Sequence, residues 1–160
     1  MEMLVEARAG FITPQEAGDR LTICFSQSFG LAVRAVAGAA PGTVLDRFTG
    51  TVGPDISQHS LQVRPGLHIA DTRFVGYLSH GCEPNCALDM ERFELVALRE
   101  IIAGEVLTIE YAATEDVLHT QFACRCGAGG CRGWITGRDD PVNAAGKASL
   151  AQHTASLPQA

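Results

Sequence analysis

Short apolar runs separated by turn residues begin at Leu21 and continue to about residue 112. The runs LTICFSQ, FGLAVRAV and GTVLDRFTGTV carry the β-branched and aromatic residues that favour strands, with glycine or proline between them. Two further pairs, SLQV with LHIA and CALDM with RFELVALREI, flank polar turns and predict hairpins, and EVLTIEYA predicts one more strand. Many short strands without alternating helices indicate a mostly β fold of small sheets.

The two ends of the chain differ from this middle part. Residues 1–20 show weak helical patterning and predict an N-terminal arm or helix. Residues 138–160 are rich in small and polar side chains, so we expect a disordered tail.

Composition narrows the classes of function. The net charge of −6 argues against direct binding to nucleic acid or to anionic membranes, and an acidic surface suits a cationic partner. The sequence contains no run of 18 apolar residues, so it predicts no membrane span. The first residues lack the basic and apolar pattern of a signal peptide, so we expect a cytoplasmic protein, or a nuclear one if the host is eukaryotic.

The cysteines suggest a metal site. Cys124, Cys126 and Cys131 have the spacing C-x-C-x4-C within a glycine-rich segment, one thiol short of a tetrahedral zinc site. Cys24 lies in an apolar run and is typical of a core thiol. Cys82 and Cys86 lie in the polar stretch YLSHGCEPNC, which also carries His80, and this stretch is the candidate source of the fourth ligand.

Three ordered motifs, YLSHGCEPN, GEVLTIEY and CRCGAGGCRGWI, together resemble a SET domain followed by a post-SET zinc tail. The resemblance covers about residues 21–137, with the SET domain at 21–120 and the zinc segment at 121–137. It implies small curved sheets and a knot-like crossing of the C-terminal segment beneath the YLSHGCEPN loop. It also implies that Cys82 joins the three tail cysteines around one structural zinc ion, with Cys86 outside the site.

The resemblance implies a protein-lysine N-methyltransferase that uses S-adenosylmethionine. Tyr111 matches the tyrosine of the family's reaction centre, and Ile109 and Phe48 are expected in the substrate channel. The residues expected around the cofactor are Phe29, Gly30, Tyr77, Ser79 and His80, with Trp134 or Ile135 covering the adenine. The expected partner is a protein with an exposed lysine.

Four departures from the family pattern leave the substrate open. Ser79 replaces an Asn, Gly76 stands where Arg is common, and Ile109 replaces an aromatic residue that limits how many methyl groups fit. The stretch from Gly50 to His68 is short for the insert that forms one wall of the peptide groove. Either a partner subunit in a homodimer completes that wall or the substrate is small. Two alternatives therefore stand beside the lysine methyltransferase: an enzyme of the same descent acting on a small amine or another non-peptide substrate, and a non-catalytic interaction module.

Overall fold

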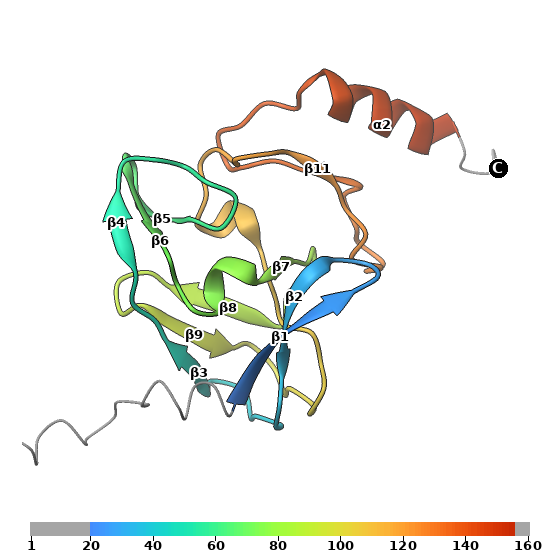
Figure 1. The fold of residues 1–160 in the computed structure, drawn as a ribbon. Coiled ribbons are helices and arrows are strands. Elements are labelled where there is room, and N and C mark those ends of the chain that lie inside the picture. The colour runs from blue at the N-terminus through green and yellow to red at the C-terminus, as the bar shows by residue number, and fades with distance from the viewer. Residues whose placement is uncertain (1–19, 156–160) are drawn as a thin grey trace, which may run out of the picture.

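A computed structural model describes residues 20–155 (Figure 1). The predicted N-terminal arm, apart from its last residue, lies outside the described part of the chain, as do residues 156–160. None of the helices in the described part has both the length and the apolar character that a membrane span needs.

The first element is an antiparallel hairpin of β1 (Leu21–Ser26) and β2 (Gly30–Ala35). Gly30 has a φ of +75°, which a residue with a Cβ adopts only with strain, and it turns the chain into β2. The base of the hairpin is buried in the core, whereas Phe25, near its far end, is 76% exposed. The far end of the hairpin therefore projects from the core, and its apolar side chains are exposed there.

Two three-stranded antiparallel sheets form the centre of the fold, and both contain a predicted hairpin. The first has the order β3 (Val44–Arg47), β9 (Glu94–Ala97), β8 (Cys86–Asp89). The second has the order β4 (Thr51–Gly53), β6 (Leu67–Ala70), β5 (Leu61–Arg64). Their buried faces share one mainly aliphatic core, as the aromatic content of 6% requires; its largest fully buried side chains include Leu21, Val33, Val75, Leu95, Ile101 and Leu107.

A parallel pair joins two distant motifs. β7 (Ser79–His80) pairs with β10 (Thr108–Ile109), preceded by the 3-10 helix η2 (Val75–Tyr77) and followed by η3 (Tyr111–Ala113). The backbone N–H of Gly81 continues the pairing by donating to the carbonyl of Ile109 at 3.0 Å. This is the predicted crossing. The expected strand EVLTIEYA is reduced to two residues here, because Glu105–Leu107 bond to β2 before Thr108 and Ile109 pair with β7.

Asn85 fixes this crossing from inside the protein. Its side chain is 3% exposed, accepts from the backbone N–H of Thr108 at 2.8 Å and donates to the carbonyl of Val106 at 2.8 Å. A buried side chain that bonds two backbone groups of another segment holds that segment in register. The 78–85 loop and the 105–111 segment are therefore bonded to each other by both side-chain and backbone hydrogen bonds.

The C-terminal part contains a helix that the sequence pattern did not predict. β11 (Phe122–Ala123) pairs with β12 (Trp134–Ile135), and α2 (Ala144–Ala155) lies across the outer side of the segment that carries β11 (Figure 1). The prediction of a disordered tail is wrong for these residues, because Gly146 of α2 packs against the Trp134 indole. That contact gives an alanine-rich stretch a surface on which to fold.

Candidate active site and metal centre

Four thiols meet where the tail crosses the loop. The sulfurs of Cys82, Cys124, Cys126 and Cys131 all lie within 4.8 Å of one another. The Cys82 and Cys124 sulfurs are 3.8 Å apart, the separation of about 3.8 Å that two thiolates have on a tetrahedral zinc with bonds of about 2.3 Å. The four thiols fit a structural zinc ion, because they fill all four positions of a tetrahedral site and leave none for a water molecule. Cys86 lies outside the group, and burial raises the pKa of its thiol to about 12.

The groups around Cys82 orient it. The backbone N–H of Arg132 donates to its sulfur at 3.4 Å, and His80 Nε2 lies 3.4 Å from the same atom. Because His80 Nδ1 accepts from the backbone N–H of Tyr111 at 3.3 Å, the imidazole is neutral and carries its proton on Nε2. His80 therefore connects the candidate metal centre to the residue expected at the reaction centre.

A second link ties the tail to the same motif. The Arg132 guanidinium contacts both carboxylate oxygens of Glu110, at 2.9 and 2.8 Å. Such a forked pair fixes geometry better than a single contact does. The tail is thus held at the thiols and at the residue before Tyr111.

An open cleft of about 210 Å³ lies between the β1–β2 hairpin, the motif loop and the tail. Its lining includes three residues predicted for the cofactor, namely Phe29, Ser79 and His80, together with Tyr111. Gly30 lies between the lining residues Phe29 and Leu31 in the chain. The motifs that the resemblance assigned to the cofactor therefore converge on one cleft.

The cleft contains a polar atom without a partner. Ser79 is 5% exposed, and its hydroxyl oxygen is buried with no hydrogen-bond partner among the described residues. Buried hydroxyls in proteins are nearly always bonded, so this orphaned one calls for a partner that the described residues do not supply, either a water or a ligand group. A bound molecule reaches the oxygen only after the hydroxyl turns toward the cleft, because the atom has almost no exposed surface in this structure.

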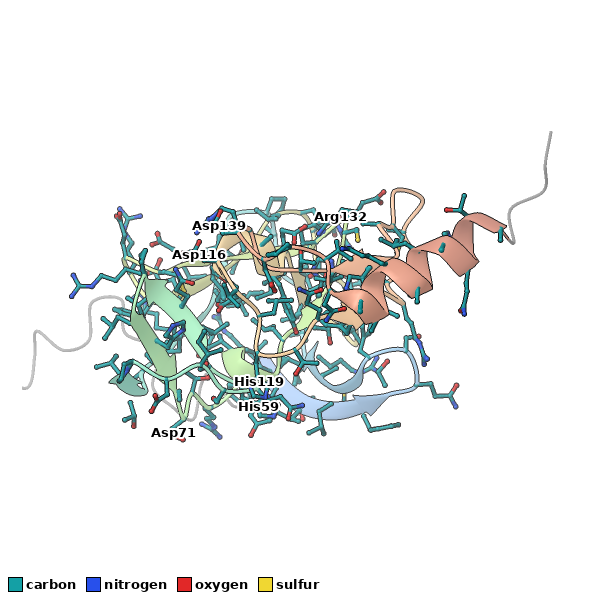
Figure 2. The ribbon with its side chains drawn as sticks, turned by 90° about the horizontal axis from the view of Figure 1, so that it is seen from above. His59, Asp71, Asp116, His119, Arg132 and Asp139 are labelled. Atoms are coloured by element: carbon teal, nitrogen blue, oxygen red, sulfur yellow. The ribbon has the colours of Figure 1, made fainter. Side chains whose placement is uncertain are left out.

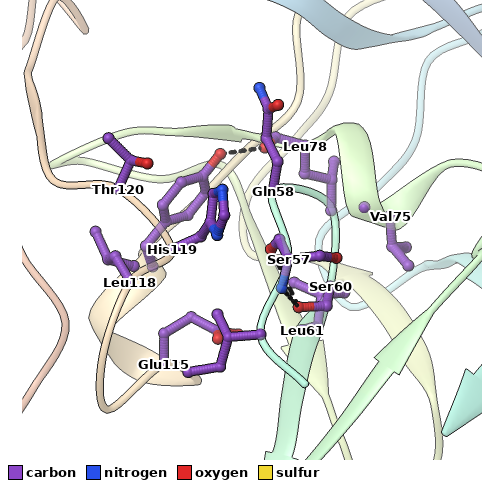
Figure 3. A pocket seen from close by; sticks show the side chains of 13 residues that line it. Ser57, Gln58, Ser60, Leu61, Val75, Leu78, Glu115, Leu118, His119 and Thr120 are labelled. Atoms are coloured by element: carbon purple, nitrogen blue, oxygen red, sulfur yellow. Dashed lines mark hydrogen bonds between the residues drawn. The ribbon is translucent and has the colours of Figure 1, made fainter. Parts of the chain in front are cut away.

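A second cavity shares one lining residue, Tyr111, with the first. Besides Tyr111, the residues that line it come from three segments (Figure 3): Ile56, Ser57, Gln58, Ser60 and Leu61; Val75, Gly76 and Leu78; and Glu115, Leu118, His119 and Thr120. The short insert thus contributes directly to the cavity. His59 anchors it, because its ring lies 4.4 Å from the Tyr77 ring and its Nδ1 contacts the Gly76 carbonyl at 3.0 Å.

Tyr111 lines both spaces. Its hydroxyl donates to the carbonyl oxygen of Leu78 at 2.5 Å, as the dashed line in Figure 3 shows. Burial raises the pKa of Tyr111 to about 12, and the negative charge of Glu115 adds to the shift. The phenol is therefore a neutral, oriented hydroxyl at any physiological pH.

Glu115 gives the second cavity a buried acid. It is 6% exposed, and its carboxylate accepts from the backbone N–H of Gln62 at 2.7 Å. Burial raises the pKa of Glu115, and Asp116 contributes in the same direction. The cavity wall combines this acid with the aliphatic side chains of Leu61, Val75 and Leu78.

Three residues predicted near the cofactor lie elsewhere. The Tyr77 ring contacts His59 and is not part of the cleft lining. Trp134 donates from its indole N–H to the Gln121 side chain at 2.9 Å and borders a separate surface groove beside Arg132 and Arg138. Ile135 is fully buried, paired with Phe122. The tail reaches the cleft through residues 122–125, around the first tail cysteine, rather than through the residues that follow the last one.

The two predicted channel residues are also placed differently. Ile109 is 2% exposed and borders a pocket with Cys86 and Leu98, away from the Leu78–Tyr111 contact. Phe48 is 5% exposed and packs edge-on against Phe93 at 5.7 Å. Neither residue lines the cavity beside the Tyr111 hydroxyl.

Several lining residues were missed by the sequence reasoning. Beyond the predicted set, the cleft is lined by Ser28, Leu31, Phe122, Ala123, Cys124 and Arg125. A signal was present for Phe122, because an aromatic residue two positions before Cys124 lies next to the metal centre in any arrangement. Its ring packs against His80 and Tyr111, with centroids 6.2 and 5.8 Å away.

The comparisons with known proteins agree with this geometry. The family model of the SET domain matches residues 8–112, and the chain belongs to the SET-domain family. "Methyltransferase flvH" of Aspergillus flavus is 30% identical over 112 residues, which cover 68% of this chain and 63% of that protein. "Histone-lysine N-methyltransferase 2D" of Homo sapiens is 34% identical over 79 residues, covering 42% of this chain and 1% of the human protein.

Solved structures show the same fold. A crystal structure of KRYPTONITE in complex with mCHG DNA and SAH superposes with a TM-score of 0.59 and 29% sequence identity. The match covers 71% of this chain and 28% of the KRYPTONITE chain. A second KRYPTONITE structure, with mCHH DNA, an H3(1-15) peptide and SAH, gives a TM-score of 0.59 at 28% identity. This chain therefore corresponds to only part of the length of each of these proteins.

Proposed function

We propose that this protein is an S-adenosylmethionine-dependent protein-lysine N-methyltransferase. The observation that carries the proposal is the position of Tyr111, which lines both the cleft at Phe29, Ser79 and His80 and the cavity at Leu78 and Glu115. A transfer enzyme needs donor and acceptor to meet at one point from two sides. The wall shared by the two spaces is such a point.

The relatives support this choice of chemistry. Their names describe a methyltransferase and a histone-lysine N-methyltransferase, and the KRYPTONITE structures contain SAH, in one case with an H3 peptide. We infer that the cleft binds S-adenosylmethionine through Phe29, Gly30, Ser79 and His80, with the unpartnered Ser79 hydroxyl as one polar contact. When bound, this cofactor supplies a methyl group on a positively charged sulfur.

The residues of this chain position the acceptor. A lysine amine has a pKa of about 10.4, so only about one molecule in a few thousand is neutral near pH 7. The charge of Glu115 attracts the cationic side chain to the cavity and favours its ammonium form. The aliphatic wall at Leu61, Val75 and Leu78 acts in the opposite direction, because excluding water lowers the pKa of the amine and favours the neutral form. The Tyr111 hydroxyl, neutral and fixed on the Leu78 carbonyl, orients the reacting nitrogen and stabilises charge beside it.

The insert bears on the choice between substrates. The sequence left open whether a partner subunit completes the wall or the substrate is small. Five residues of the insert, Ile56, Ser57, Gln58, Ser60 and Leu61, line this cavity within the single chain. A homodimer stays a prediction, but this wall does not require one. The assembled wall favours a side chain entering the cavity from a protein. The prediction of no nucleic-acid binding rests on the net charge of −6 alone, while KRYPTONITE is solved with DNA.

The test is transfer of a labelled methyl group. The purified protein is incubated with labelled S-adenosylmethionine and, separately, with histones, host-cell extract and a panel of small amines. We expect label on lysine side chains of protein, and its loss in Tyr111→Phe. Label on small amines alone would favour the small-amine enzyme. Binding of no cofactor by calorimetry would favour the interaction module and overturn the proposal.

A further inference from the structure

The walls of both spaces depend on one segment, residues 115–125, which we call the strap. Glu115, Leu118, His119 and Thr120 line the second cavity described above, here called the inner cavity, and residues 122–125 line the cofactor cleft. Apart from β11 at Phe122–Ala123, the strap has no regular strand or helix, and His119 and Thr120 are exposed. Its position therefore has to be set by contacts with other parts of the chain.

The segment that follows the metal centre supplies such contacts. The backbone N–H groups of Arg138 and Asp139 donate to the carbonyls of Glu115 and Asp116, both at 2.9 Å. Asp116 and Asp139 lie close together in the view of Figure 2. Gly137 allows this approach, because a Cβ there would lie 2.3 Å from the Asp116 carbonyl oxygen. The first half of the strap is thus bonded to the chain just before α2.

Gln121 makes the second connection with one amide group. Its oxygen accepts from the Trp134 indole N–H at 2.9 Å and from the backbone N–H of Asn143 at 3.0 Å. Its nitrogen donates to the carbonyl of Pro141 at 2.8 Å. The residue directly before the cleft-lining Phe122 is therefore fixed from three sides.

Helix α2 closes the arrangement. Gly146 is the residue of α2 that is buried, and a Cβ on it would lie 2.4 to 2.7 Å from three atoms of the Trp134 indole. The Asn143 side chain accepts from the backbone N–H of Gly146 at 2.9 Å and so begins the helix. Docking of α2 and the position of Trp134 are consequently coupled through direct contact.

We propose that residues 137–155 form a brace that sets the position of the strap, with Gln121 and Trp134 as positioning residues for cofactor binding. The proposal rests on the proposed function for its cofactor. A strap that is held in place in only about a tenth of the molecules would weaken the apparent affinity about tenfold. The brace thus acts on affinity through Phe122 and its neighbours, without touching the bound molecule.

The sharpest test is Gly146→Ala in the full chain, with Gly129→Ala as the matched control. Alanine favours an isolated helix by about 1 kcal/mol over glycine, so a free α2 would gain from the change. A docked α2 has no room for the methyl group at position 146, whereas a methyl group on Gly129 would meet no heavy atom within 4 Å. Gly146→Ala therefore has opposite expected effects on α2 in the two cases: it stabilises a helix that is free, and it disrupts a helix that is docked on Trp134.

Three readouts are compared between the variants and the parent. Trp134 is the single tryptophan, so its emission reports docking of α2. Hydrogen exchange reports the strap, and calorimetry reports affinity for S-adenosylmethionine. For Gly146→Ala and for Gln121→Ala we expect red-shifted emission, faster exchange in residues 115–125 and about tenfold weaker binding. Zinc content should stay unchanged, and Gly129→Ala should match the parent.

The outcomes separate the two proposals. Gly146→Ala with parental emission, or with shifted emission but cofactor affinity within about twofold of the parent, would overturn the brace. A parent protein that binds no S-adenosylmethionine would instead count against the proposed function. In that event emission and hydrogen exchange still decide whether residues 137–155 hold the strap.

Discussion

The Tyr111 hydroxyl donates a 2.5 Å hydrogen bond to the Leu78 carbonyl oxygen, so one phenol is oriented by the loop that also carries Ser79 and His80. The motif GEVLTIEY thereby presents its tyrosine to the motif YLSHGCEPN, with the crossing of β7 and β10 beneath them. This contact between the two motifs depends on the Tyr111 hydroxyl and not only on its ring.

Replacing Tyr111 with Phe keeps the ring and removes this hydroxyl. We expect turnover to fall by about 10² to 10³, the usual cost of removing one group that stabilises developing charge. Affinity for S-adenosylmethionine should change little, because the ring still walls the cleft. Calorimetry and labelled-methyl transfer measure the two effects. A variant that turns over within about threefold of the parent would remove Tyr111 from the mechanism.

The metal centre gives a prediction with a built-in control. Cys82→Ser removes one of four clustered thiols, so zinc content should fall and residues 120–137 should exchange hydrogen faster. Cys86→Ser changes a buried thiol outside the cluster and should retain zinc. Elemental analysis of both purified variants is the measurement. Equal loss of zinc from the two proteins would show that the ligand set is wrong.

The thiol cluster could be grouped from the sequence because ligand type and spacing are local signals, and the family motifs supplied the distant fourth cysteine. The hairpins followed from alternation around glycine and polar turns for the same reason. The three motifs met at one cleft because each forms its own loop beside the crossing.

Side-chain directions were harder to predict. Tyr77 stacks on His59 of the insert, and Trp134 turns toward α2, so both aromatic rings serve contacts that depend on distant segments. Helix α2 itself has one buried residue, a glycine, and no apolar stripe that a sequence pattern would reveal. Its docking depends on the shape of the Trp134 surface, which exists only after the tail is folded.

Asn85 supplies a prediction about the crossing. Asn85→Ala would leave the backbone groups of Thr108 and Val106 without their partners in a buried place, at a cost of about 2–4 kcal/mol in the free energy of unfolding. Asn85→Asp has nearly the same shape but cannot donate to Val106 or to the Glu105 carboxylate. It should therefore destabilise the protein comparably in thermal unfolding. A tolerated Asp would show that shape, and not the hydrogen bonds, holds the crossing.

Glu115 links stability to pH. Burial raises the pKa of its carboxyl, with Asp116 acting in the same direction, so folding favours the protonated form. A raised pKa in the folded state contributes stability at low pH, and that contribution is lost as the pH rises through the folded pKa. Glu115→Gln stays neutral throughout, and its side-chain oxygen still accepts from the Gln62 N–H.

We therefore expect Glu115→Gln to melt a few degrees higher than the parent at about pH 8, with a smaller difference at about pH 5. Thermal unfolding across this range measures the difference, with Glu91→Gln at an exposed turn as the control. A pH-independent difference for Glu115→Gln would mean that the buried carboxylate is fully compensated by its hydrogen bonds. Since Glu115 also lines the inner cavity, the same variant separates its two roles. A gain in stability together with weaker binding of a lysine peptide would show that the acid is kept for the cationic substrate at the expense of the fold.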